Sequence, residues 1–170
     1  DVLQSRGLGD VYKRQGKKGS QWIATKKEFS NFDLRLEYKI PTDGNSGVFI
    51  RAPKEGNPWV TGLEIQVLDD YGPKWKDLKP DQFTAAIYAV QPPSERATKK
   101  AGEWQTMRIR CNGDQCCVWI NGNCIIDANF TELTPKAKNV TGLKRTQGFI
   151  GLQNHASPVH FRNIQIKRLK

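Results

Sequence analysis

The chain of 170 residues lacks several patterns that identify common classes of protein. It has one methionine and two histidines, and none of its apolar runs approaches the roughly 20 residues that a transmembrane helix needs. No segment of useful length repeats apolar residues at the helical period, and there is no internal repeat or low-complexity tract. These absences argue against a helical bundle and against a membrane span.

The four cysteines also lack a recognisable metal-binding pattern. Cys111, Cys116, Cys117 and Cys124 lie close together without the CxxC spacing that is typical of structural zinc sites. The hairpin expected around them places Cys111 opposite Cys116, which permits a disulfide without requiring one. We interpret them as small apolar strand residues.

Carboxylates are fewer than basic residues. Lys and Arg number 27 against 17 for Asp and Glu, which gives a formal net charge of +10. The basic residues are scattered in pairs such as Lys26-Lys27 and Lys99-Lys100, and they do not form a stripe interleaved with aromatic residues. We therefore expect solvated strand faces and loops, and no nucleic-acid partner.

Short strands dominate what is present. Residues 32–40 alternate apolar and polar side chains, which is typical of a strand with one buried face. Turn residues separate this strand from further predicted strands at 21–25, 47–52, 62–68, 104–111, 116–120, 124–127, 148–153 and 159–167. The dipeptides Asn112-Gly113 and Asn121-Gly122 predict two tight hairpins. In the last strand, a β-bulge near Arg162-Asn163 would restore one apolar face. The set predicts an all-β, antiparallel β-sandwich.

Charged and amide side chains occupy strand positions where Thr, Ser or Lys would be ordinary. Glu64 and Gln66 point to one face of their strand, and Arg51 belongs to the strand before it. Gln153, Asn154 and His155 follow another apolar strand. We expect Arg51, Glu64, Gln66 and His155 to converge as one polar site on one face of a sheet.

At the start of the chain, apolar residues repeat neither at the helical period nor at the two-residue period of a strand. Residues 1–15 (DVLQSRGLGDVYKRQ) contain neither an apolar stretch nor a cleavage signal of a secretion leader. We interpret residues 1–15 as a non-native, scar-like leader that lies outside the fold, and residues 16–170 as a single β-sandwich domain.

Six motifs in order along the chain carry a resemblance to a known family. They are FDLRLEY (32–38), GNSGVFIR (44–51), GLEIQVLD (62–69), AGEW (101–104), WING (119–122), and IGLQNH (150–155) followed by FRNI (161–164). The chain resembles the 3-keto-disaccharide hydrolase domain family, which implies a concanavalin-like jelly-roll sandwich. Two departures stand out. The family's opening strand is missing, which predicts an exposed edge and a homo-dimer formed through it. The closing motif reads Asn154-His155-Ala156 where the family has Asp-His-Gly.

The resemblance implies hydrolysis of the glycosidic bond of 3-keto-glycosides or 3-keto-disaccharides. A ketone at C3 acidifies the C2 proton, so a base can remove it, the C1 substituent can leave, and water can add. His155 or Glu64 is the candidate base, and Arg51 or a bound divalent cation would stabilise the enolate. Glu64 and His155 are candidate ligands for such a metal, with Asp69 as a lesser one. Asp69 or Asp70 could also join Glu64 as the carboxylate pair of a classical glycosidase.

The carbohydrate substrate would contact further side chains, and the family implies a periplasmic or secreted location. The candidate substrate-binding residues are Asn45, Gln66, Asp69, Tyr88 and Trp59. The alternative is a non-catalytic, lectin-like carbohydrate-binding module in which Trp59, Trp75 or Tyr88 stacks on a sugar. Such a module would bind without turnover.

Overall fold

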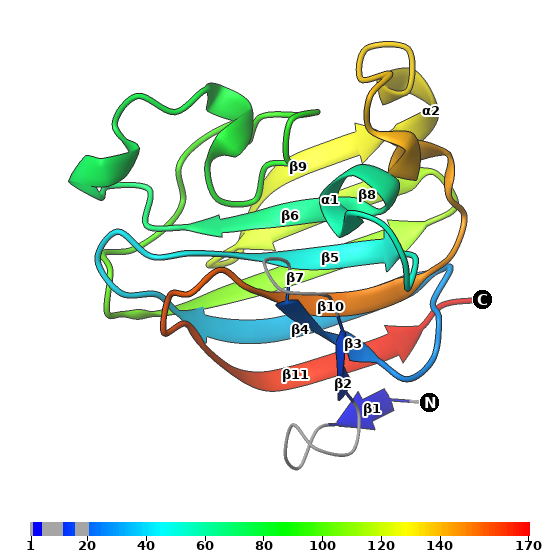
Figure 1. Cartoon of the computed structure of the whole chain (residues 1–170), viewed down its shortest axis with the longest axis horizontal. Helices are drawn as coiled ribbons and strands as arrows, with labels where there is room; N and C mark the ends of the chain where they lie inside the picture. Colours follow the sequence, from blue (N-terminus) through cyan, green and yellow to red (C-terminus); the bar gives the residue numbers. More distant parts are fainter. Residues whose placement is uncertain (1, 5–11, 16–20) are drawn as a thin grey trace.

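The computed structural model describes residues 2–4, 12–15 and 21–170, and it consists of two antiparallel sheets (Figure 1). The six-stranded sheet contains, in spatial order, β1 (Val2–Gln4), β11 (His160–Arg168), β4 (Phe32–Lys39), β7 (Trp104–Asn112), β8 (Gln115–Ile120) and β9 (Asn123–Asn129). The five-stranded sheet contains β2 (Tyr12–Gln15), β3 (Gln21–Thr25), β10 (Phe149–Asn154), β5 (Asn45–Ala52) and β6 (Leu63–Leu68). The predicted all-β sandwich is confirmed.

Helical segments are short and lie in the connections. They are α1 (Pro58–Thr61), η1 (Pro73–Trp75), η2 (Pro80–Gln82), α2 (Phe130–Leu133) and η3 (Thr141–Lys144). The connection between β6 and β7 lies at one end of the sandwich and α2 at the other (Figure 1). No helix in the described part of the chain is long and apolar enough to cross a membrane.

The core fills the space between the two sheets, because alternate residues of each strand point inward. In β4 the buried positions Phe32, Leu34, Leu36 and Tyr38 alternate with more exposed polar ones. From the other sheet, strands β5, β6 and β10 contribute Val48, Ile50, Leu63, Ile65, Val67, Ile150 and Leu152 to the same cluster.

The predicted hairpins and their register are confirmed. Asn121 and Gly122 both have positive φ in the two-residue turn that joins β8 to β9. Cys111 pairs with Cys116 across β7 and β8, with the two buried thiols 3.5 Å apart and both free. The bulge expected in the last strand is also present. The pairing of β11 with β4 shifts between residues 162 and 165, and Asn163 has a φ of 52°.

The expectation that residues 1–15 lie outside the sandwich needs correction for the seven of them that the structure describes. Val2–Gln4 pairs antiparallel with β11, and Tyr12–Gln15 pairs antiparallel with β3. The edges of β11 and β3 that the missing strand was expected to expose are therefore covered by these two stretches. The origin of residues 1–15 stays a prediction, and Val11 lies outside the described residues.

The free edge of β6 is also occupied. Segment 84–88 runs along it, and the amide of Ala85 donates to the carbonyl of Gln66 at 2.9 Å. The amide of Tyr88 donates to the carbonyl of Glu64, also at 2.9 Å. This segment lies next to the polar positions of β6 and so helps to build the site described next.

Candidate functional site

The polar positions of β6 lie on the outer face of the five-stranded sheet. Leu63, Ile65 and Val67 belong to the core, so Glu64 and Gln66 point the other way. Both are nonetheless buried, at 4% and 3% exposure. The sequence predicted this shared face correctly.

Two glycines make room for the side chains that lie on this face. Gly47 pairs with Gln66 in the neighbouring strand, and a Cβ at position 47 would clash with Oε1 of Glu64. A Cβ at Gly151 would clash in the same way with the indole of Trp22. The carboxyl group and the indole therefore lie flat against the sheet, which no larger residue would permit. The indole packs edge-to-face on Phe49, with 5.5 Å between ring centroids.

The carboxyl group of Glu64 has unusual protonation behaviour for its residue type. Burial raises the pKa of Glu64 to about 8, and the side chain of Gln153 lowers that pKa by a smaller amount. Desolvation disfavours the charged carboxylate, so the group exchanges a proton near neutral pH. Strongly shifted carboxyl groups of this kind are frequent at catalytic sites.

The connection after β6 closes one side of the site. The hydroxyl of Tyr88 accepts a hydrogen bond from Nε2 of Gln82 at 2.9 Å, and its ring packs edge-to-face with Trp59 at 5.7 Å. Nε2 of Gln66 donates to the carbonyl of Gln82 at 3.2 Å, while its Oε1 accepts from the amide of Val67. Gln66 thus helps to hold this connection in place through its hydrogen bond to Gln82.

The expectation that Arg51 shares the face of Glu64 is wrong. The pairing of β5 with β10 shifts by one residue, and Arg51 has a φ of 49°, so a β-bulge redirects its side chain. Its guanidinium, in a residue that is 1% exposed, donates to the carbonyls of Arg145 at 3.0 Å, Ser30 at 3.2 Å and Gly113. It also lies over the ring of Phe130. Arg51 therefore holds several loops together away from Glu64.

The two aspartates after β6 support turns. Oδ2 of Asp69 accepts from the amide of Asp43 at 3.0 Å, and its Oδ1 accepts from Tyr71 at 3.4 Å. Oδ1 of Asp70 accepts from the amide of Thr84 at 2.8 Å. Because both carboxylates accept hydrogen bonds from backbone amides in turns, we do not assign either of them to the carboxylate pair of a classical glycosidase.

His155 lies in the exposed loop directly after β10. The loop is tied down by Asn45, whose amide donates to the hydroxyl of Ser157 at 3.1 Å. Ala156 has a φ of 61°, a conformation that glycine adopts more easily, and this is the position where the resembled family has glycine. The loop therefore lies beside the start of β5, at the end of the sheet where β10 finishes.

The divalent cation expected from the sequence stays a prediction, and its candidate ligands are few. Across residues 2–4, 12–15 and 21–170 no group of three His, Cys, Asp or Glu side chains could hold a metal ion. The ligands proposed from sequence, Glu64 and His155, have no third partner of this kind in the described chain.

Trp22 and Phe49 were missed as site residues by sequence reasoning, whereas Gln153 was singled out as part of a polar cluster. All three lie on the same face as Glu64, where Gly47 leaves room for the Glu64 carboxyl group and Gly151 for the Trp22 indole. Their strand parity was readable from the sequence. Which strands lie side by side was not, because pairing between distant segments leaves no local signal.

The two antiparallel sheets, packed face to face around one core, define a jelly-roll sandwich fold. A family model described as a 3-keto-alpha-glucoside-1,2-lyase-like domain matches residues 4–167. The chain belongs to this family, as the sequence motifs predicted.

Individual relatives agree with this assignment. The chain is 29% identical to a 3-keto-disaccharide hydrolase of Bacteroides thetaiotaomicron, over 98% of this chain and 68% of the relative. A crystal structure from Parabacteroides distasonis, provisionally named a glycosyl hydrolase, superposes with a TM-score of 0.79 at 30% identity and covers 98% of this chain and 93% of its own. A carbohydrate-binding module from Bacillus subtilis has a TM-score of 0.57 at 14% identity, covers 98% of this chain and 94% of its own, and shows a likeness of fold alone.

Proposed function

We propose that this protein cleaves the glycosidic bond of 3-keto-glycosides by elimination followed by hydration, with Glu64 as the base. The observation that carries the proposal is the buried carboxyl group of Glu64, whose pKa burial raises to about 8. A base with a pKa near the working pH removes a carbon-bound proton more effectively than an ordinary glutamate does. The names of the family and of its relatives support the same substrate class.

In the proposed reaction the carboxylate of Glu64 takes the proton from C2 of the sugar ring. The electron pair moves toward the C3 ketone, and the C1–oxygen bond breaks to release the leaving alcohol, which takes a proton from solvent. Water then adds its oxygen at C1 and gives a proton back to solvent, and Glu64 returns the first proton to C2. The net change is one glycosidic bond cleaved and one water consumed.

Unpaired acceptors around the site support a sugar as the ligand. Oε1 of Gln153 and Oδ1 of Asn45 are buried and have no hydrogen-bond partner among the described residues. Buried acceptors are normally paired, and sugar hydroxyl groups are suitable donors for them. The hydroxyl of Tyr88 accepts from Gln82, which leaves its own proton available for a substrate oxygen.

His155 keeps a role as the second candidate proton carrier, from the loop at the end of β10. Arg51 is not assigned to the enolate, since its guanidinium is engaged with backbone carbonyls. No step is assigned to a metal, because the side chains described do not build a three-ligand site. The family also supports a periplasmic or secreted location, which fractionation of the native host would check.

The decisive experiment incubates the protein with a 3-keto-glucoside and with the unoxidised parent glucoside, each with and without a chelator. Release of the aglycone from the 3-keto compound alone is the expected result. Cleavage of the parent at an equal rate would overturn the elimination route. Binding of either compound, measured by calorimetry, without any release would instead identify a non-catalytic carbohydrate-binding module.

A further inference from the structure

The outer face of the six-stranded sheet carries an unusual arrangement of basic residues. Leu34 and Leu36 of β4 point into the core, so Arg35 points outward, on the opposite side of the molecule from Glu64. Arg35 pairs in register with Arg108 of β7. Like charges directly opposite each other destabilise a sheet, so this placement works against stability.

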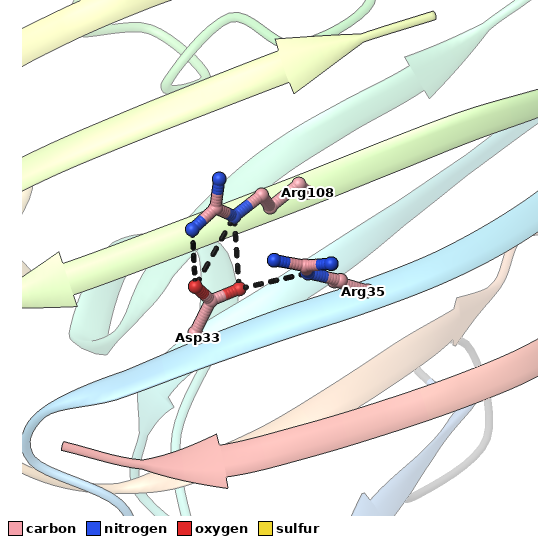
Figure 2. A network of polar contacts seen from close by, with 3 residues as sticks. All are labelled: Asp33, Arg35 and Arg108. Atoms are coloured by element: carbon pink, nitrogen blue, oxygen red, sulfur yellow. Dashed lines mark hydrogen bonds and ion pairs between the residues drawn. The ribbon is translucent and has the colours of Figure 1, made fainter. Parts of the chain in front are cut away.

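The carboxylate of Asp33 forms ion pairs with both Arg35 and Arg108. Asp33 accepts from Nε of Arg108 at 3.0 and 3.1 Å, whereas its contact with Nε of Arg35 is 3.5 Å (Figure 2). The Arg35 side chain is 62% exposed, and an ion pair of that length and exposure contributes little. Arg108 is therefore neutralised while Arg35 stays available to an anion.

Two further cations flank the same carboxylate. Arg110 and Lys167 are the two residues paired with Asp33 across the neighbouring strands. Neither forms an ion pair within the described portion of the chain. Four basic side chains thus lie around Asp33, and an external anion would balance the positive charge that Asp33 leaves unpaired.

This face is also hollowed. A groove of about 560 Å³ and another of about 470 Å³ adjoin, and both are lined by Arg35, Arg108 and Gln165. The larger groove adds Thr106, Trp119, Asn163 and Glu37, whose carboxylate accepts from Nε of Arg162 at 2.7 Å and from Nδ2 of Asn163 at 2.8 Å. The guanidinium of Arg108 lies 4.7 Å from the centroid of Trp119, a contact that fixes its plane. Hydroxyl and amide groups next to fixed guanidinium groups suit a ligand with both hydroxyl and anionic groups.

We propose that this groove binds an acidic polysaccharide, that is, a glycan chain carrying carboxylate or sulfate groups. A single-stranded nucleic acid fits less well, because bases need open aromatic faces on which to stack. Here Arg108 covers Trp119, and Arg162 lies 3.7 Å from the centroid of Trp104. Binding on this face leaves the Glu64 face free, so the protein can hold a polymer while the other face acts on a small sugar.

The test compares binding of the 170-residue protein with binding of two double variants by affinity gel electrophoresis. The ligands are polygalacturonate, dextran sulfate, neutral dextran and a single-stranded oligonucleotide. Arg35→Gln/Arg110→Gln removes two exposed charges from the groove and leaves the Arg108–Asp33 pair intact. Lys26→Gln/Lys27→Gln is the matched control, since it removes the same charge from exposed positions elsewhere.

We expect the groove variant to bind an acidic polysaccharide about tenfold more weakly than wild type, because it loses two exposed ion pairs and each such pair contributes only a modest part of the affinity. The control should stay within twofold of wild type. Whether polygalacturonate or dextran sulfate binds more tightly identifies the anionic group. Equal losses in both variants would show diffuse charge attraction and overturn the proposal. Equal binding of neutral dextran, or tighter binding of the oligonucleotide, would overturn it as well.

Discussion

Glu64 owes its properties to three neighbours that have no charge of their own. Gly47 provides the space beneath the carboxyl group, Gln153 provides a polar neighbour, and the connection through Tyr88 closes the strand edge. None of these offers the positive charge that would lower the pKa of a carboxyl group. The carboxyl group of Glu64 is therefore mostly protonated at neutral pH, and it loses its proton as the pH rises toward about 8.

Replacing that carboxyl group by an amide should abolish most of the activity. We expect Glu64→Gln to lower kcat/KM for a 3-keto-glucoside by about 10²–10⁴, the usual contribution of a general base. In the wild type, kcat/KM should rise with pH and level off above about pH 8, as Glu64 loses its proton. Glu95→Gln, at an exposed position, is the control and should match wild type. An unchanged rate in Glu64→Gln would assign the base elsewhere, with His155 as the next candidate.

The same carboxyl group should make stability depend on pH. Its pKa is 4.5 unfolded and about 8 folded, so the folded state holds the proton more tightly. The associated stabilisation is complete below about pH 4.5 and is lost as pH rises through about 8. Urea unfolding at pH 5, 7 and 9 should show this loss in wild type and a clearly smaller one in Glu64→Gln. Parallel pH profiles for the two proteins would contradict the assignment.

His155 is an exposed loop residue, so its function and its contribution to stability can be separated. We expect His155→Ala to reduce turnover of a 3-keto-glycoside by about 10²-fold or more, if the imidazole moves a proton. Its unfolding midpoint should change little, because exposed loop substitutions usually cost under about 0.5 kcal/mol. His160→Ala, at the start of β11, is the matched control for loss of an imidazole. Wild-type turnover in His155→Ala would leave Glu64 as the only base.

At the level of elements, the bulge in β5 converts a residue that looks functional into a structural one. Arg51 donates to carbonyls of three separate loops, and Nε of Arg145 donates back to the carbonyl of Arg51 at 2.8 Å. These contacts join the connections before β4, between β7 and β8, and before β10. A charged donor buried among carbonyls stabilises those loops, and of its three nitrogens only Nε has no hydrogen-bond partner among the described residues.

Loss of this guanidinium should destabilise the protein. We expect Arg51→Met to lower the free energy of unfolding by about 2–4 kcal/mol, because hydrogen bonds to charged groups contribute about 1.5–3 kcal/mol each and a buried methionine recovers part of that. Chemical denaturation with Arg110→Met as an exposed control would measure the difference. A variant that unfolds like wild type but has lost turnover would restore Arg51 to the catalytic site.

Elements that depend on local pattern were predictable, whereas those that depend on pairing between distant strands were not. Three features depend only on neighbouring residues and were predicted correctly: the alternation in β4, the Asn-Gly turns and the bulge at Asn163. The bulge at Arg51 has no such signal, since simple alternation places its side chain with Glu64. Trp22 was missed as a site residue for a related reason, because β3 joins the site only through its pairing with β10.

At the scale of the whole molecule, the two outer faces differ in chemistry. The five-stranded sheet presents a buried carboxyl group among aromatic rings, and the six-stranded sheet presents solvated arginines around Asp33. The formal charge of +10 is therefore not spread evenly, and part of it is gathered on one sheet. The proposed anionic polymer and the proposed small sugar would occupy separate surfaces, because the core lies between the two sheets.

The outermost strands allow a prediction about association. Among the residues whose side chains the structure describes, the fully buried members of the main core cluster begin at Phe29, and we expect a variant lacking residues 1–15 to fold with a cooperative transition. It would, however, uncover the edges of β11 and β3 that Val2–Gln4 and Tyr12–Gln15 pair with. Unpaired edges promote pairing between molecules, so we expect a concentration-dependent dimer in analytical ultracentrifugation, with more dimer than in the full-length chain. Loss of cooperative unfolding would show that the first strands are integral to the fold. A monomer at every concentration would show that these edges do not drive association.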